Sequence, residues 1–175
     1  MLMGKSVSML SSALVTAHLI ADKVWQTLTG QEGIFSTLIA YCHEDAGGKM
    51  HRKDICVKRP FAKGEHVLVN GGKPLAPRWN RDPHHPRLLY SEATPSNIRL
   101  MAVTMDHKRS VVSDFDGLNM LPSFASDGNR VVYCFTQHGK SQLFCYEVNA
   151  TNKRSTLRPL THNDGNNLSP CLLDN

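Results

Sequence analysis

The chain has 175 residues and a mass of 19.5 kDa, which fits one domain of ordinary size and allows a second only if it is small. Hydrophobic residues make up 41% and charged residues 20%, a composition that excludes wholesale disorder. The net charge of +5 is mild and concentrates only between residues 49 and 59, so the tight basic stripe of a nucleic-acid-binding protein is missing. No apolar run approaches the ~20 residues of a membrane-spanning helix, and no transmembrane segment is predicted.

Residues 10–28 are predicted to form an amphipathic helix, because apolar residues recur there at three- and four-residue spacing. Gly30 stands where a left-handed residue ends a helix. An alternative makes residues 1–17 a signal peptide, with Lys5 as its charged region. Serines interrupt that apolar run and no small-residue cleavage site follows it, so an export signal is not the favoured interpretation.

From Phe35 onward, short runs of β-branched and aromatic residues alternate with turn residues, which is typical of an all-β protein. Five cysteines occur in the chain without a C-x-x-C pair, which excludes a zinc ribbon or a thioredoxin motif. Most of them lie in strand-like runs and are expected to pack as small hydrophobes. An alternative pairs Cys134 with Cys145 across a tight turn in an oxidising compartment.

Internal repeats distinguish among the all-β architectures. Leu88-Leu89-Tyr90 aligns with Val131-Val132-Tyr133 at a step of 43, and Ile39-Ala40-Tyr41 lies 49 residues before the Tyr90 run. Three further segments align at steps of 45 and 48: Pro77-Arg78-Trp79, Pro122-Ser123-Phe124 and Pro170-Cys171-Leu172. A period of this length indicates propeller blades.

One repeat can be written out strand by strand. Its strands are predicted at 121–124, 130–136, 142–148 and 158–161, with a turn in which Gly128 takes positive φ and a hairpin turn at 138–140. The chain holds about three such units, whereas propellers need roughly 4–8 blades to close a ring. We therefore expect a fragment, or a truncated copy, of a longer protein.

Two stretches carry a family resemblance. The first comprises His18-Leu19-Ile20-Ala21-Asp22-Lys23-Val24, Leu28-Thr29-Gly30, Gly33-Ile34-Phe35, Thr37 and Ile39-Ala40-Tyr41. The second comprises Pro122-x-Phe124-x-Ser126-Asp127-Gly128, the 131–133 strand, Gln142-Leu143-Phe144, Pro159-Leu160-Thr161 and Ser169-Pro170. Together they resemble the TolB family, in which a helix ending in a Leu-Thr-Gly turn leads into the first propeller strand. The resemblance covers residues ~13–175 and is poorest between Asp45 and Asp116.

The resemblance implies a mainly β fold, with an N-terminal helix followed by about three four-stranded blades of a six-bladed TolB-like propeller. Residues 1–33 would correspond to the end of the TolB N-terminal α/β domain, and residues 34–175 to a partial propeller. Most of the α/β domain and about half of the propeller are missing from the chain.

The family function implied is that of a periplasmic, non-enzymatic binding protein of the Tol-Pal envelope system, which serves outer-membrane integrity and cell division. Its partners would be the peptidoglycan-associated lipoprotein, bound through one face of the propeller, and the Tol inner-membrane complex. Two alternatives stay open: a propeller fragment of a prolyl-oligopeptidase-type peptidase, and a truncated, non-functional product.

No motif in the sequence predicts catalysis, a cofactor or a metal. His84 and His85 are read as surface turn residues, because no ligand at metal-binding spacing accompanies them. Gly139-Lys140-Ser141 lacks the first glycine of a phosphate-binding loop and lies between two strands. Asp114 and Asp116 suit a turn.

His18 could pair with Asp22 one helical turn later, in a structural role. The sequence predicts no catalytic, cofactor-binding or metal-binding residues. Partner-binding residues stay unassigned, since no motif fixes the binding loops.

Overall fold

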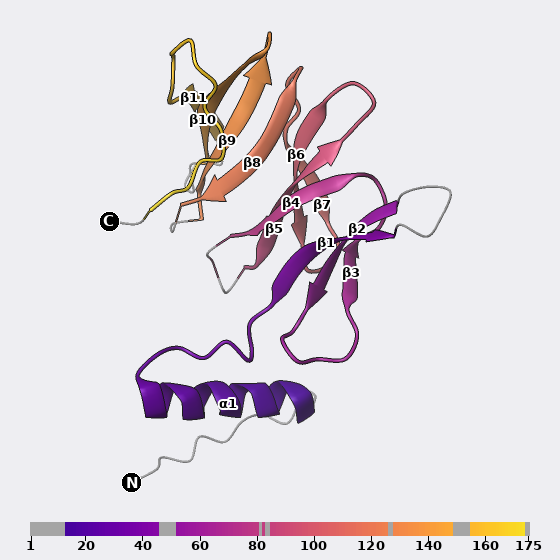
Figure 1. Cartoon of the computed structure of the whole chain (residues 1–175), viewed down its shortest axis with the longest axis vertical. Coiled ribbons are helices and arrows are strands. Elements are labelled where there is room, and N and C mark those ends of the chain that lie inside the picture. Colours follow the sequence, from indigo (N-terminus) through magenta and orange to yellow (C-terminus); the bar gives the residue numbers. More distant parts are fainter. Residues whose placement is uncertain are drawn as a thin grey trace. The chain divides into compact units, whose positions relative to one another are not determined.

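The computed structural model describes residues 13–45, 52–80, 82, 85–125, 128–148 and 155–173. Over these residues the chain is mainly β, with one helix near its N-terminus followed by eleven strands (Figure 1). This confirms the coarser part of the predicted fold class, a mainly β chain with an N-terminal helix. The chain forms two compact units, residues 1–39 with 57–66, and residues 40–56 with 67–175. The division predicted at residues 33 and 34 stays a prediction.

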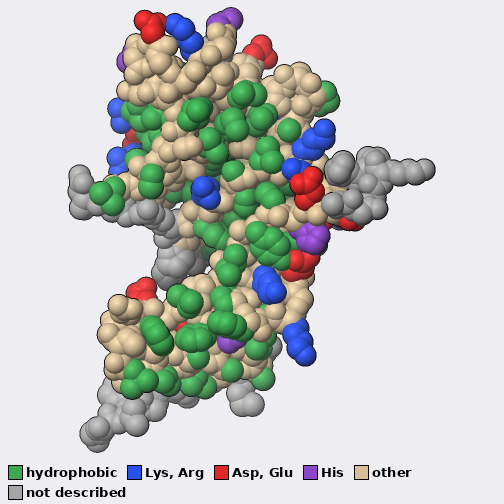
Figure 2. Space-filling model, in the orientation of Figure 1, with side chains coloured by type: hydrophobic (Ala, Val, Ile, Leu, Met, Phe, Trp, Pro, Cys, Tyr) green, Lys and Arg blue, Asp and Glu red, His purple; other side chains and the backbone are tan. Residues whose placement is uncertain are grey.

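The helix α1 (Ala13–Thr29) agrees with the predicted segment 10–28, of which the first three residues lie outside the described part. It ends as predicted: Gly30 has φ 73°, and its N–H donates to the carbonyl of Gln26 at 2.9 Å. Its apolar side chains are largely exposed (Figure 2).

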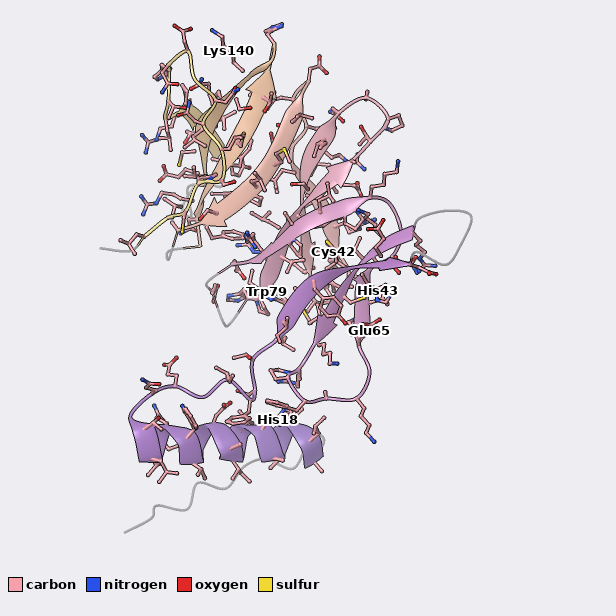
Figure 3. The ribbon with its side chains drawn as sticks, viewed as in Figure 1. His18, Cys42, His43, Glu65, Trp79 and Lys140 are labelled. Atoms are coloured by element: carbon pink, nitrogen blue, oxygen red, sulfur yellow. The ribbon has the colours of Figure 1, made fainter. Side chains whose placement is uncertain are left out.

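Asp22 ties α1 to the segment that follows it. The carboxylate Oδ1 accepts the backbone N–H of Phe35 at 2.7 Å, and Oδ2 accepts that of Ser36 at 2.9 Å. The hydrogen bond suggested between His18 and Asp22 is therefore wrong, since the described residues form none between these two side chains. His18 itself is buried on α1, with its Nδ1 unpartnered among the described residues (Figure 3).

Three strands form a small sheet in the order β1-β2-β3. Their bounds are β1 (Ile39–Asp45), β2 (Arg52–Lys58) and β3 (His66–Val69).

The remaining eight strands form two four-stranded antiparallel meanders, which we call meander A and meander B. Meander A consists of β4 (Pro74–Trp79), β5 (Arg87–Ala93), β6 (Ile98–Thr104) and β7 (Arg109–Ser113). Meander B consists of β8 (Leu118–Phe124), β9 (Arg130–Gln137), β10 (Lys140–Val148) and β11 (Ser155–Pro159). Neighbouring strands pair in chain order within each meander. The four strands predicted for one repeat are those of meander B, with ends shifted by up to three residues.

The two meanders meet through a parallel bridge and an apolar core. Ile98 of β6 pairs with Leu118 of β8. The core cluster takes side chains from both meanders: Leu89, Leu100, Phe124, Val131 and Tyr133. The aligned Tyr90 and Tyr133 are both fully buried, which explains why the sequence repeats at these positions.

A buried polar network crosses the junction between the meanders. Asn119 of β8 is fully buried, and its Oδ1 accepts the Ser113 hydroxyl at 2.7 Å. Its Nδ2 donates to the carbonyls of Ile98 and Phe115, each at 2.8 Å. The Ser113 hydroxyl also lies 2.9 Å from the hydroxyl of Tyr133. The network therefore links β6, β7, β8 and β9.

All five cysteines are free thiols, so the alternative that joins Cys134 to Cys145 is wrong. The register explains why: Cys134 faces Leu143 and Cys145 faces Val132, which makes the two cysteines diagonal neighbours. Cβ atoms in diagonal pairs lie too far apart for a disulfide. Both side chains are buried and pack as small hydrophobes, as expected.

Candidate functional site

The three aligned proline segments share an unusual backbone conformation. The residue before each proline has positive φ: 49° at Ala76, 56° at Leu121 and 54° at Ser169. Residues other than glycine seldom adopt this conformation, and it costs of order 1–3 kcal/mol at each position. Its recurrence at repeat spacing identifies it as a feature of the fold.

In the two meanders, this conformation produces a β-bulge in the first strand. The register shifts between Leu75 and Arg78 in β4, and between Met120 and Ser123 in β8. A bulge bends the strand and changes the direction of the side chains that follow. The residues after each proline are therefore re-aimed relative to a regular strand.

These three segments line one hollow of about 400 Å³. Meander A contributes Arg78 and Trp79 at the end of β4, where Figure 3 shows Trp79. Meander B contributes residues 121–124 of β8, and the segment after β11 contributes residues 169–171. Equivalent positions of successive repeats thus converge on a single cavity.

The segment after β11 is held against β8 by a side chain of the hollow. The backbone N–H of Leu172 donates to the Ser123 hydroxyl at 3.0 Å. Two loop contacts fix the start of the same segment: Asn167 donates its N–H to the carbonyl of Ser141, and Asn166 accepts the N–H of Ser141. These hydrogen bonds tie the segment after β11 to β8 and to the start of β10.

The side chains that line the hollow are suited to binding a protein segment. Its lining includes one charged side chain, the exposed guanidinium of Arg78, beside the aromatic rings of Trp79 and Phe124. Among the described residues of this lining there is no carboxylate and no histidine. A cation set among apolar walls is suited to an acidic or carbonyl-rich protein segment.

Sequence reasoning found the repeat but did not assign this site. The Pro-x-aromatic alignment singled out the lining segments, and it carried no signal for the positive φ that precedes each proline. The convergence of the three segments needed the tertiary structure.

The other residues singled out from the sequence lie elsewhere. His85 is exposed and pairs with Asp82 (Nδ1 to Oδ2, 3.0 Å), while His84 lies outside the described residues. Lys140 begins β10 directly after a hairpin turn in which His138 and Gly139 both have positive φ, so the Gly139-Lys140-Ser141 segment opens no helix. Gly128 has φ 68°, as its predicted turn requires.

A second exposed surface belongs to α1. The helix and the loop after it present large apolar side chains to solvent, from 44% exposed at Leu14 to 78% at Leu28. Within the same unit, Phe35 stacks near Phe61 with ring centroids 5.9 Å apart, and Arg59 donates to the carbonyl of Ser36 at 2.7 Å.

Successive four-stranded antiparallel meanders that share one apolar core, with their first strands converging on one hollow, are typical of a β-propeller repeat protein. The chain belongs to the TolB β-propeller domain family, whose family model matches residues 25–174.

Comparisons with individual proteins agree with this family. The chain is 30% identical over 127 residues to the Tol-Pal system protein TolB of Rickettsia rickettsii (strain Sheila Smith), and 31% identical over 127 residues to that of Rickettsia massiliae (strain Mtu5). Each match covers 71% of this chain, and the chain spans 28% of the length of these relatives.

Solved structures show the same fold. The crystal structure of TolB from Acinetobacter baumannii matches with a TM-score of 0.71 and 21% identity, over 83% of this chain and 36% of the other. The structure of a putative TolB from Agrobacterium tumefaciens matches with a TM-score of 0.60 and 14% identity, over 77% of this chain and 46% of the other. In the part of the chain that the structure describes, no helix combines the length and apolar character needed to cross a bilayer.

Proposed function

We propose that this chain is a non-enzymatic binding component of the Tol-Pal envelope system, working in the periplasm. Its partners would be the peptidoglycan-associated lipoprotein and the Tol inner-membrane complex, and its role outer-membrane integrity and cell division. The name of the curated relatives, Tol-Pal system protein TolB, supports the assignment to this system.

The hollow lined by the three proline segments is the observation that carries the proposal. A binding protein of this kind uses loops on a rigid scaffold, and affinity comes from a few anchors near the centre of a face. In this arrangement Arg78 is the charged anchor, and Trp79 with Phe124 supplies apolar contact. In this proposal the two meanders and the β1–β3 sheet act as about three blades. Residues 1–33 correspond to the end of the TolB N-terminal α/β domain, and residues 34–175 to part of a TolB-like propeller.

The test is a titration of the purified chain with the purified lipoprotein, its lipid anchor removed. In a Trp25→Phe background, Trp79 is the remaining tryptophan, so a change in its emission reports binding at the hollow. Arg78→Glu is expected to weaken binding at least tenfold, because it places a repelling charge in the hollow.

Arg158→Glu is the matched control, since it makes the same charge change on the exposed strand β11, away from the hollow. Binding that responds equally to both substitutions would reflect net charge alone and would contradict the site. A chain that is folded and does not bind the lipoprotein at all would contradict the proposed function.

A further inference from the structure

A second cavity, which we call the groove, opens between meander A and meander B. Its volume is about 210 Å³. One wall consists of side chains from β5, β6 and β7, and the other of side chains from β8, β9, β10 and the turn that contains Gly128. The groove shares only Phe124 with the hollow of the proline segments, so it is a separate site.

The groove is an apolar extension of the core between the two meanders. Three of its lining residues belong to the core cluster, and three more are partly buried against that cluster. They are Leu89, Phe124 and Val131, and Ala102, Val112 and Tyr146, respectively. Apolar cavities of ~150 Å³ in other proteins take up benzene. The groove therefore has room for at least one large apolar side chain of a partner.

Strand β7 borders the groove and has an open edge. Among the described residues it pairs with β6 alone. Its residues Ser110, Val111 and Val112 line the groove, and Val111 is 52% exposed. An unpaired strand edge is a template on which another chain can pair through its backbone. The groove thus combines an apolar cavity with a row of backbone donors and acceptors.

The groove also carries a positive charge. The exposed Arg87, at the start of β5, is the charged residue of its described lining, which contains no carboxylate. Asp82 lies near Gly128, but its carboxylate is paired with His85 at 3.0 Å. A carboxylate on an incoming segment would therefore find an oppositely charged partner in Arg87.

We propose that the groove binds an extended peptide segment of a partner protein, which adds to the open edge of β7 as a further strand. Alternate apolar side chains of the segment enter the groove, and an acidic side chain pairs with Arg87. In this mode of recognition, main-chain hydrogen bonds provide affinity and the pockets for alternate side chains provide specificity. The proposal goes beyond lipoprotein binding at the hollow, and each can fail without the other.

The first experiment is a titration of a synthetic peptide, Leu-Thr-Leu-Thr-Leu-Asp-Asp labelled with fluorescein, with the 175-residue chain, followed by fluorescence polarisation. The peptide is expected to bind, and Arg87→Glu should raise its Kd roughly tenfold or more. Arg158→Glu is the matched control, because it makes the same charge change on β11, the outer strand of meander B. It should leave the Kd nearly unchanged, and so should Arg78→Glu in the hollow.

A second variant tests the cavity directly. Ala102→Leu places a larger apolar side chain in the groove and should raise the Kd of the peptide roughly tenfold or more. The melting temperature of this variant should stay the same or rise, since filling an apolar cavity is commonly stabilising. Circular dichroism of both groove variants checks that they are folded.

Hydrogen exchange shows where the peptide lies. Binding should protect outward-facing amides of β7, and it should leave those of β11, the equivalent outer strand of meander B, unchanged. Protection of β11 in place of β7 would overturn the proposal, and so would the absence of binding up to ~1 mM chain.

The remaining outcomes identify other occupants or another site. Equal affinity for a peptide that ends in two lysines would contradict the pairing with Arg87 and overturn the proposal. Loss of peptide binding in Arg78→Glu would place the peptide in the hollow. Self-association of the chain that Ala102→Leu abolishes would assign the groove to a second copy. Either of these last two results would also overturn the proposal.

Discussion

Gly117 lies at the junction between the two meanders, and replacing it by alanine should strongly lower the free energy of unfolding. Its φ of 127° lies outside the left-handed helical region and is suited to glycine alone. A Cβ built there would lie well inside 3.0 Å of the Thr136 carbonyl oxygen, a distance that Cβ atoms essentially never show, and 3.1 Å from its carbonyl carbon. Gly117 also accepts the N–H of Ile98 at 3.1 Å, beside the bridge that joins the meanders.

The clash cannot be relieved cheaply, because Thr136 belongs to the backbone of a central strand. It pairs with Leu118 of β8 on one side and with Ser141 of β10 on the other. Backbone strain of about 1–3 kcal/mol and overpacking of about 1–3 kcal/mol together predict that Gly117→Ala lowers the free energy of unfolding by roughly 2–6 kcal/mol.

Gly139→Ala is the matched control, because Gly139 also has positive φ, 77°, and a Cβ there would meet no atom within 4 Å. Gly139→Ala should lower the free energy of unfolding only by the strain of the left-handed conformation, about 1–2 kcal/mol. The lower conformational entropy of the unfolded chain without this glycine offsets part of that loss. Urea denaturation followed by circular dichroism measures both variants. Gly139→Ala lowering the free energy of unfolding by as much as Gly117→Ala, or by more, would refute the reasoning.

Three further predictions concern other parts of the chain. Asp22→Asn should increase hydrogen exchange at the backbone amides just after α1. Hydrogen bonds from the Ser36 hydroxyl and from two backbone amides hold the pKa of Asp22 below its ordinary value. In the parent chain, protection of these amides should therefore persist above about pH 4 and fall as the pH drops through the lowered pKa. Asn119→Ala should lower the free energy of unfolding by about 3–5 kcal/mol in urea denaturation, since it removes the partner of one hydroxyl and two carbonyls; a loss under 1 kcal/mol would contradict a role for the network. Ala76→Gly should raise the melting temperature slightly by relieving positive φ, whereas Ala102→Gly, in regular strand β6, should lower it, and the same sign for both would contradict the assigned strain.

Local signals and the sequence repeat predicted several elements of the fold. The helix ended at Gly30 as predicted, because a periodic apolar face and a following glycine are local signals. The four strands of meander B were predicted because turn residues and buried positions recur at fixed offsets, and the family follows from the same residues. The Cys134–Cys145 alternative failed because the hairpin register, which decides which side chains face each other, cannot be read from spacing alone.

The sequence by itself determined the helix, the four strands of meander B, the repeat and the family, because these depend on local propensity and on periodic burial that each segment encodes separately. Only the tertiary structure decided the site. The positive φ before each proline is a strained conformation that local preference disfavours, and packing of the whole repeat must hold it there. The meeting of three segments, each separated from the next by more than forty residues, around one hollow depends on how the meanders stack, which no segment specifies alone.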